Sequence, residues 1–195
     1  MNRAEIINFL KSHLKPRRVE HCLGVEKAAR ELALRYGADP EKAALAGLVH
    51  DCAKSMDPVL MAQYAREEGF PMDGMNGAGA GILHAPAGAV LAHRALGICD
   101  REVLSAVCWH TVPRPDMSLL DKIVSLADII EPNRDFGGVE NIRQAAKRNL
   151  DEAFRLSLAR VMCHVLEEGL FLHPQTLQVY NELTLSELPV ISPRS

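Results

Sequence analysis

The chain has no apolar run that approaches the roughly 20 residues of a membrane span, and its first residues lack the hydrophobic region of a signal peptide. It also lacks an excess of positive charge, because its formal net charge is −3. Proteins that bind nucleic-acid polymers usually carry a basic excess. These absences predict a soluble, cytoplasmic protein without membrane or nucleic-acid partners.

The cysteines do not form any C-x-x-C pair, and their number is odd. A disulfide framework or a cysteine-rich zinc site normally shows paired spacings. We therefore expect reduced and mostly buried thiols in a reducing compartment. The five positions are Cys22, Cys52, Cys99, Cys108 and Cys163.

No window shows the period-two alternation of a β-strand for more than a few residues. Instead, apolar residues recur at helical spacing, and 48% of the 195 residues are hydrophobic. This pattern predicts an all-α bundle of about ten helices. We expect one domain over residues 1–188, followed by a frayed tail over residues 189–195.

Two C-terminal helices are expected, a long one from 139 to about 168 and a last one that reaches Leu188. Capping residues mark most of the other expected helix starts. The expected starts lie at Asn2, Pro16, Asp39-Pro40, Asp57-Pro58, Pro86, Asp100 and Ser118. Between residues 69 and 82 five glycines interrupt the pattern. The stretch lacks the G-K-[ST] ending of a phosphate-binding loop and has no strand before it, so a surface loop is expected.

The segment from Gly47 to Ser55 places an imidazole beside a carboxylate, at His50 and Asp51. If the segment is helical, both side chains converge on one ion at the helix edge, and Lys54 lies one turn away, within reach of a phosphate oxygen. An isolated His-Asp pair is more often a buried polar pair. Other histidines and aspartates at predicted helix ends favour a site here.

Four residues form a mixed nitrogen and oxygen ligand set: His21, His50, Asp51 and Asp128. Asp128 is surrounded by isoleucine, leucine and alanine in its predicted helix, where an unpaired carboxylate is costly. Such a set suits iron, manganese, cobalt or zinc, with magnesium as a further candidate. Four protein ligands leave open positions for water on a six-coordinate ion.

His84 and His110 have two interpretations: they bind a second metal ion, or they donate hydrogen bonds to a substrate phosphate. His84 stands at a predicted helix N-terminus, where free amide groups favour an anion. His173 lies at a helix junction and its role is open. The remaining histidines, His13, His93 and His164, occupy ordinary helical positions and are expected to be structural or exposed.

The order H…HD…H…H…D resembles that of HD-domain metal-dependent phosphohydrolases, and several runs resemble the YqeK family of bacterial HD-domain hydrolases. The resemblance covers about residues 5 to 180. The runs are Leu83-His84-Ala85-Pro86, Trp109-His110-Thr111, 117–123, Ala127-Asp128-Ile129-Ile130-Glu131-Pro132-Asn133-Arg134-Asp135-Phe136 and Leu172-His173-Pro174. The run over residues 127–136 is the most specific of them.

The resemblance implies a symmetrical bis(5'-nucleosyl)-tetraphosphatase, which cleaves diadenosine tetraphosphate to ADP with iron as the usual metal, in a homodimer. It implies that the metal ligands are His21, His50, Asp51 and Asp128, with Asp51 and Lys54 as catalytic residues. The implied nucleotide or phosphate contacts are Lys54, His84, His110, Arg134 and His173.

Two features depart from the family pattern: Val112-Pro113 stands where the family favours Thr-Gly, and the stretch from Gly74 to Gly81 resembles an insertion. Both would flank the site and affect substrate preference more than chemistry. Two alternatives therefore stay open. One is an HD-domain nucleotidase or phosphodiesterase with another substrate, and the other is a non-catalytic nucleotide-binding HD protein.

Overall fold

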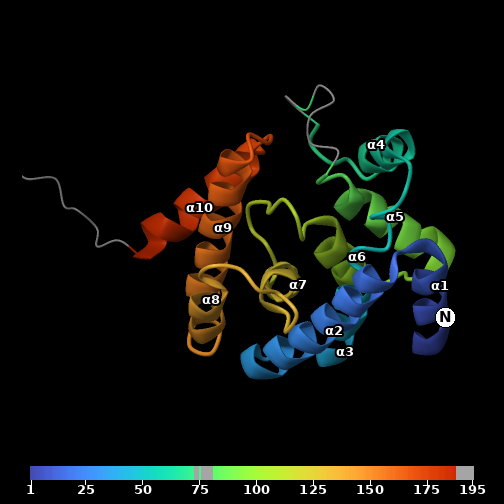
Figure 1. The fold of residues 1–195 in the computed structure, drawn as a ribbon, viewed down its shortest axis with the longest axis horizontal. Helices are drawn as coiled ribbons and strands as arrows, with labels where there is room; N and C mark the ends of the chain where they lie inside the picture. Colours follow the sequence, from blue (N-terminus) through green and yellow to red (C-terminus); the bar gives the residue numbers. More distant parts are fainter. Residues whose placement is uncertain (73–74, 76–80, 188–195) are drawn as a thin grey trace, which may run out of the picture.

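The computed structural model describes residues 1–72, 75 and 81–187, and every regular element in that part of the chain is a helix (Figure 1). This confirms the all-α class and the expected number of about ten helices. The helices are α1 (Arg3–His13), α2 (Pro16–Tyr36), α3 (Pro40–Val49), α4 (Pro58–Glu67), α5 (His84–Leu96), α6 (Arg101–Cys108), α7 (Leu119–Ile130), α8 (Val139–Ala145), α9 (Leu150–Glu167) and α10 (Pro174–Glu187).

Polar side chains satisfy the free amide groups at several helix starts, as the sequence predicts. At α1, the Glu5 amide donates to Asn2 Oδ1 over 3.0 Å and the Asn2 amide donates to the Glu5 carboxylate over 2.7 Å. Asp39, Asp57 and Asp100 each accept two amide hydrogens in the first turn of α3, α4 and α6. These caps fix where each helix begins and therefore which residues stand at its ends.

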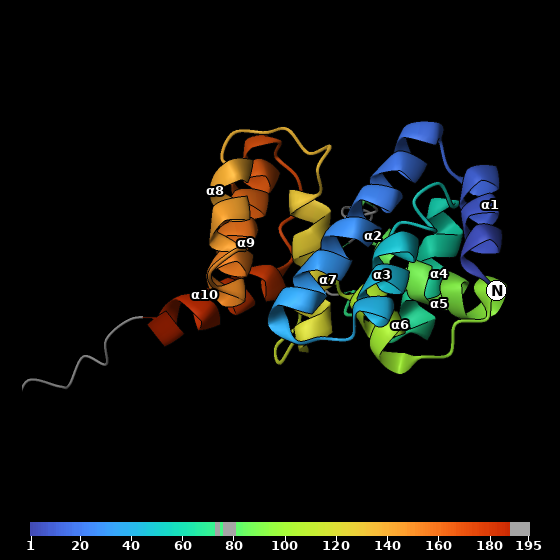
Figure 2. The same ribbon diagram turned by 90° about the horizontal axis from the view of Figure 1, so that it is seen from below.

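Helix α7 runs through the middle of the molecule, between the N-terminal helices and the group α8–α10 (Figures 1 and 2). It packs against α2, α3, α6, α8 and α9. Ile123, Val124 and Leu126 on this helix are completely buried. Asp128, in the last turn of α7, is thereby held between elements from both ends of the chain. None of the described helices combines the length and apolar character needed to span a membrane.

The segment after α3 is not helical, contrary to the expectation for residues 47–55. Helix α3 ends at Val49, and residues 50–55 form successive turns. The His50 ring donates to the Gly47 carbonyl over 2.7 Å. A continuing helix would use that carbonyl for the amide of Asp51, so the side-chain bond competes with the helix at this point.

The prediction of one long helix from 139 to 168 is also wrong. Helix α8 ends at Ala145 and a separate helix α9 begins at Leu150. The Asn149 side chain accepts the Glu152 amide over 3.0 Å and so caps a new helix start. The break lets α8 and α9 pack against each other and against α7.

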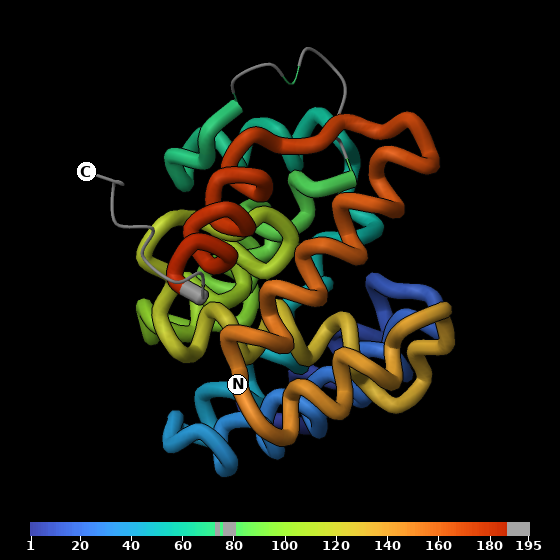
Figure 3. The backbone as a smooth tube through the Cα atoms, turned by 90° about the vertical axis from the view of Figure 1, so that its left-hand side faces the viewer, coloured from blue at the N-terminus to red at the C-terminus, as the bar shows by residue number. Residues whose placement is uncertain are grey.

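The link between α9 and α10 returns to the loop that follows α4 (Figure 3). His173 Nε2 donates to the Pro71 carbonyl over 3.2 Å, and the His173 ring lies 5.7 Å from that of Phe70. This contact joins the C-terminal helices to the segment that precedes α5. The glycines expected in a loop at 74, 77 and 79, and the tail 189–195 with Leu188, lie outside the described residues.

Candidate metal centre

Four buried histidines from α2, α5 and the ends of α3 and α6 point one ring nitrogen toward a common centre. Three of them donate from Nδ1 to the carbonyl oxygen three residues earlier, each over 2.7 Å: His50 to Gly47, His84 to Gly81 and His110 to Val107. Because a carbonyl only accepts hydrogen bonds, Nδ1 carries the proton and Nε2 keeps its lone pair in the neutral ring. This arrangement is typical of metal-binding histidines.

His21 is oriented by a side chain instead. It lies inside α2, and its Nδ1 is 3.1 Å from the Glu131 carboxylate. Glu131 is only 2% exposed and also accepts the Asn133 amide over 2.8 Å. A Cβ at Gly24 would lie 2.4 Å from Glu131 Oε2, so only a glycine leaves room for this carboxylate. The sequence indicated Glu131 only as part of a helix end, and its role was missed.

The Asp51 carboxylate lies between two pairs of histidines. Its Oδ2 is 3.8 Å from His21 Nε2 and 3.5 Å from His50 Nε2. Its Oδ1 is 3.0 Å from His84 Nε2 and 4.0 Å from His110 Nε2. Asp51 therefore presents one oxygen to each pair, although the sequence left the relation between the two pairs open.

Asp128 closes the centre from α7. Its Oδ1 is 3.0 Å from His21 Nε2 and 3.9 Å from His50 Nε2. Arg134 donates to the same oxygen over 2.6 Å and to the Asp128 carbonyl over 2.8 Å. His21, His50, Asp51 and Asp128, which the sequence singles out as one ligand set, thus come together from three parts of the chain.

The donor atoms of this centre fit a transition-metal ion. Three overlapping groups have ligand atoms within 4.8 Å of one another: His21, His50 and Asp51; His50, His110 and Asp128; Asp51, His84 and His110. The buried Nε2 of His50 has no hydrogen-bond partner in the described part of the chain. A buried nitrogen without a partner is costly and therefore points to a ligand. Imidazole and carboxylate donors suit the borderline metals.

The pKa shifts favour the metal-binding forms of the candidate ligands. Burial opposes charge on Asp51 and Asp128, but the facing histidines, with Lys54 and Arg134, outweigh it and hold both carboxyl pKa values well below the usual range. Burial lowers the pKa of His110 to about 3. The centre is thus made of charged carboxylates and a neutral imidazole at His110, which are the metal-binding forms.

Cationic side chains surround the two aspartates. Lys54 Nζ is 3.1 Å from both His84 ring nitrogens and 4.0 Å from Asp51 Oδ1, so the turns bring it where the helical interpretation had placed it. Arg18 Nη1 donates to Asp51 Oδ2 over 2.7 Å. The sequence did not single out Arg18, since an arginine in the first turn of a helix is normally a solvated residue.

His173 is not brought to the centre. Its ring contacts the Pro71 carbonyl and lies beside the rings of Phe70 and Phe171, with a centroid distance of 6.1 Å to Phe171. Phe171 itself lines a pocket that opens on His84. His173 itself does not line that pocket, and its expected contact with the nucleotide stays a prediction.

Two pockets open on the centre. The first, here called the apolar pocket, has about 470 Å³ and reaches Lys54, His84, His110 and Asp128. Its walls are mostly apolar: Ile82, Ile129, Leu158, Val161, Val165, Leu170 and Phe171. The second, here called the basic pocket, has about 520 Å³. It is lined by Lys15, Arg17, Arg18, Glu20, His21, Glu131, Asn133 and Arg134.

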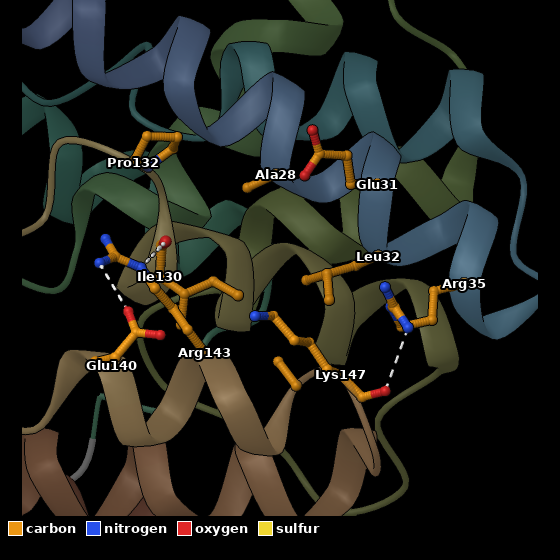
Figure 4. Close-up of a pocket in the computed structure, with 10 residues that line it drawn as sticks. Ala28, Glu31, Leu32, Arg35, Ile130, Pro132, Glu140, Arg143 and Lys147 are labelled. Atoms are coloured by element: carbon orange, nitrogen blue, oxygen red, sulfur yellow. Dashed lines mark hydrogen bonds and ion pairs between the residues drawn. The ribbon is translucent and has the colours of Figure 1, made fainter.

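A third pocket, of about 480 Å³, lies behind the turn that follows α7 and contains none of the predicted site residues (Figure 4). Arg143 from α8 reaches from this pocket into the turn. Its Nε donates to the Ile130 carbonyl over 3.0 Å, and its Nη2 donates to the carbonyls of Glu131 and Arg134 over 2.8 and 2.9 Å. Arg143 therefore supports the turn that carries Glu131 and Arg134, which contact His21 and Asp128 of the centre.

Comparison with known proteins agrees with this centre. The HD domain family matches residues 18–133, a range that includes His21, His50, Asp51 and Asp128. A protein of Halalkalibacterium halodurans named bis(5'-nucleosyl)-tetraphosphatase, symmetrical, is 43% identical over 96% of this chain and all of its own length. The chain belongs to the YqeK family of HD-domain hydrolases.

Other members of the family extend the comparison. A Bacillus subtilis protein with the same name is 38% identical over 94% of this chain and 98% of its own length. A predicted HD superfamily hydrolase from Clostridium acetobutylicum, known from a crystal structure, is 38% identical in sequence. The match covers 96% of this chain and 99% of that protein's chain, with a TM-score of 0.89. The resemblance expected from the sequence is confirmed over nearly the whole chain.

Proposed function

We propose that this HD-domain hydrolase cleaves diadenosine tetraphosphate symmetrically into two molecules of ADP. The observation that carries the proposal is the centre itself: four inward-facing imidazoles and two charged carboxylates beside a pocket with apolar walls. Relatives of nearly equal length bear the name of this activity. A nucleobase suits the apolar walls, and phosphates suit the cations at the pocket floor.

We assign His21, His50, Asp51 and Asp128 as the metal ligands and iron as the metal. When bound, a transition metal supplies Lewis acidity and activates water for attack near neutral pH. Glu131 keeps the His21 proton on Nδ1, so that Nε2 is free to ligate. Arg18 and Arg134 balance the charge of the two aspartates.

Lys54, His84, His110 and Arg134 are the groups that we assign to the phosphates. Lys54 stands at the floor of the apolar pocket and donates toward phosphate oxygens, where charge builds up during phosphoryl transfer. In this assignment His84 and His110 reach a phosphate with Nε2, which donates only in the doubly protonated ring because Nδ1 already gives its proton to a backbone carbonyl. The alternative is a second ion held by these two rings with Asp51, and metal analysis separates the two by giving one or two ions per chain.

The test is product analysis of the metal-loaded protein with diadenosine tetraphosphate in ¹⁸O-water. Two ADP, one carrying ¹⁸O, is the expected result. ATP with AMP would contradict symmetric cleavage, and a panel of mononucleotides checks for a nucleotidase. Asp51→Ala removes an oxygen donor from both histidine pairs and should lose metal and activity, while circular dichroism shows that the helices persist. Full metal content with normal turnover in this variant would contradict the ligand assignment.

We also propose that the chain works as a homodimer in the cytoplasm. Its five cysteines are free thiols, as a reducing compartment keeps them. Several large apolar side chains are exposed on α9, α10 and their link: Leu166, Leu170, Leu177 and Leu185. Light scattering measures the mass directly, and a mass of 21.4 kDa would mean a monomer.

A further inference from the structure

The metal centre separates the apolar pocket from the basic pocket. Among the residues that the structure describes, none lines both pockets. Asp128 lines the apolar pocket, whereas its two close neighbours, His21 at 3.0 Å and Arg134 at 2.6 Å, line the basic pocket. A ligand that passes over the ligating residues therefore has room on both sides of them.

The two pockets differ in chemistry. The basic pocket has four cationic side chains, Lys15, Arg17, Arg18 and Arg134, against the carboxylates of Glu20 and Glu131. The Glu131 carboxylate already accepts the Asn133 amide and faces His21. The pocket thus favours an anion with several charges, whereas the apolar pocket favours a base and a ribose.

We infer that the basic pocket is the leaving-group subsite, which holds the phosphates of the second nucleoside diphosphate. This inference rests on the proposed function. A cut at the middle of a tetraphosphate needs a substrate that extends equally on both sides of the attacked bond, and one pocket accommodates only one half. The second half lies over Lys15 and Arg17, at the start of α2.

The reaction balances with this placement. The oxygen of water forms a bond to the central phosphorus of the half in the apolar pocket. The bond from that phosphorus to the central bridging oxygen breaks, and this oxygen leaves with the diphosphate in the basic pocket. The two protons of the water go to solvent near neutral pH, and each half departs as ADP.

Lys15 and Arg17 are the residues that test the subsite. Arg18 and Arg134 already pair with Asp51 and Asp128, so replacing them would disturb the centre. The exposed side chains of Lys15 and Arg17 form no hydrogen bond or ion pair within residues 1–72, 75 and 81–187. They are therefore available to phosphate, and their removal leaves the ligating residues untouched.

The experiment compares Lys15→Ala/Arg17→Ala with Lys27→Ala, which removes an exposed cation from the same helix outside the pocket. In the metal-loaded protein, the double variant should lose about 10- to 100-fold in kcat/KM for diadenosine tetraphosphate, the range for lost charged hydrogen bonds. Its affinity for an analogue with a methylene group between the central phosphates should fall by a similar factor. Arg17→Glu should weaken both further.

ADP binding supplies the second readout. We expect ADP to bind more tightly in the apolar pocket, which also takes its base and ribose, so the dissociation constant of this tighter site should change less than about 3-fold in the double variant, well below the loss of one charged contact. Metal content should equal that of the wild-type protein. Normal kcat/KM and analogue affinity in the double variant would overturn the subsite while the proposed function stands. Absence of tetraphosphate cleavage by the wild-type protein would instead overturn the proposed function.

Discussion

Among the partners of Nδ1 in the four histidines, Glu131 is the side-chain carboxylate, whereas the other three partners are backbone carbonyls. His21 lies within α2, where the backbone carbonyls serve the helix, so its Nδ1 needs an acceptor from elsewhere. The carboxylate comes from a residue 110 positions later in the chain. Charge on this acceptor makes the imidazole a stronger ligand.

Glu131→Gln should therefore weaken metal binding by about 10- to 100-fold, the range for partners of ligating histidines. Gly24→Ala is the matched variant, because its methyl group would lie 2.4 Å from Glu131 Oε2 and displace the carboxylate without removing it. Competition with a chelator measures both affinities. Glu31→Gln, an exposed site on α2, is the control. Unchanged affinity in Glu131→Gln would contradict this role.

The sequence was enough to propose the candidate ligands that the fold brings together, but it did not indicate the residues that support them. His50, Asp51 and Asp128 stand out because polar residues interrupt apolar segments, where they are costly without a partner. Arg18 and Glu131 interrupt nothing: each stands at a helix end, where charged residues are common. Their roles depend on contacts across the fold, which periodicity does not reveal.

The turn after α7 is the element on which the centre depends, and α8 holds it in place. Arg143 donates to three backbone carbonyls of this turn, at Ile130, Glu131 and Arg134. Figure 4 shows the first of these hydrogen bonds. The last carbonyls of a helix have no partner within the helix and need one from outside. A planar guanidinium reaches several of them at once, which a lysine ammonium does not.

Arg143→Met should lower the free energy of unfolding by about 2–4 kcal/mol, because three charge-assisted hydrogen bonds are lost and carbonyls are left without partners. It should also lower kcat/KM, since Glu131 and Arg134 lose their fixed turn. Urea denaturation and steady-state kinetics measure the two effects. Arg148→Met removes an exposed arginine of the same region and serves as control. Equal stability of the two variants would contradict the role of Arg143.

The helix starts followed from the sequence better than the helix ends. Asp39, Asp57 and Asp100 cap their helices as expected, because a side-chain oxygen before a helix has a local and specific effect. The break between α8 and α9 was missed because residues 145–148 are good helix formers. Packing of both helices against α7 outweighs that local preference.

At the scale of the whole molecule, the centre joins residues from α2, from the turns after α3 and from the end of α7. In the metal-free protein, the histidines of this centre make the free energy of unfolding depend on pH. His50 and His110 are completely buried in the centre, and burial lowers both pKa values, for His110 to about 3. The unfolded chain takes up protons on these residues near pH 6.5, but the native protein does not. His21 acts in the opposite sense, because Asp128 and Glu131 outweigh its burial and raise its pKa.

The metal-free protein should therefore become less stable as the pH falls from 6.5 toward 3. Each buried neutral histidine contributes up to about 1.4 kcal/mol per pH unit, since protons bind only to the unfolded state. The stabilisation from His21 is complete below pH 6.5 and is lost as the pH rises through its higher native pKa. Below pH 6.5 the His21 contribution is constant, so His50 and His110 set the slope and stability falls on acidification.

Urea denaturation of the chelator-treated protein at pH 7.5, 6.0 and 5.0 measures this slope. His110→Gln keeps a donor for the Val107 carbonyl but cannot titrate, so its free energy of unfolding should fall less steeply, by about 1.4 kcal/mol per pH unit. His164→Gln, at an exposed position of α9, should keep the wild-type slope. If His110→Gln and His164→Gln gave the same slope, His110 would not be a neutral, buried imidazole in the native metal-free protein, and its pKa would not be lowered as burial predicts.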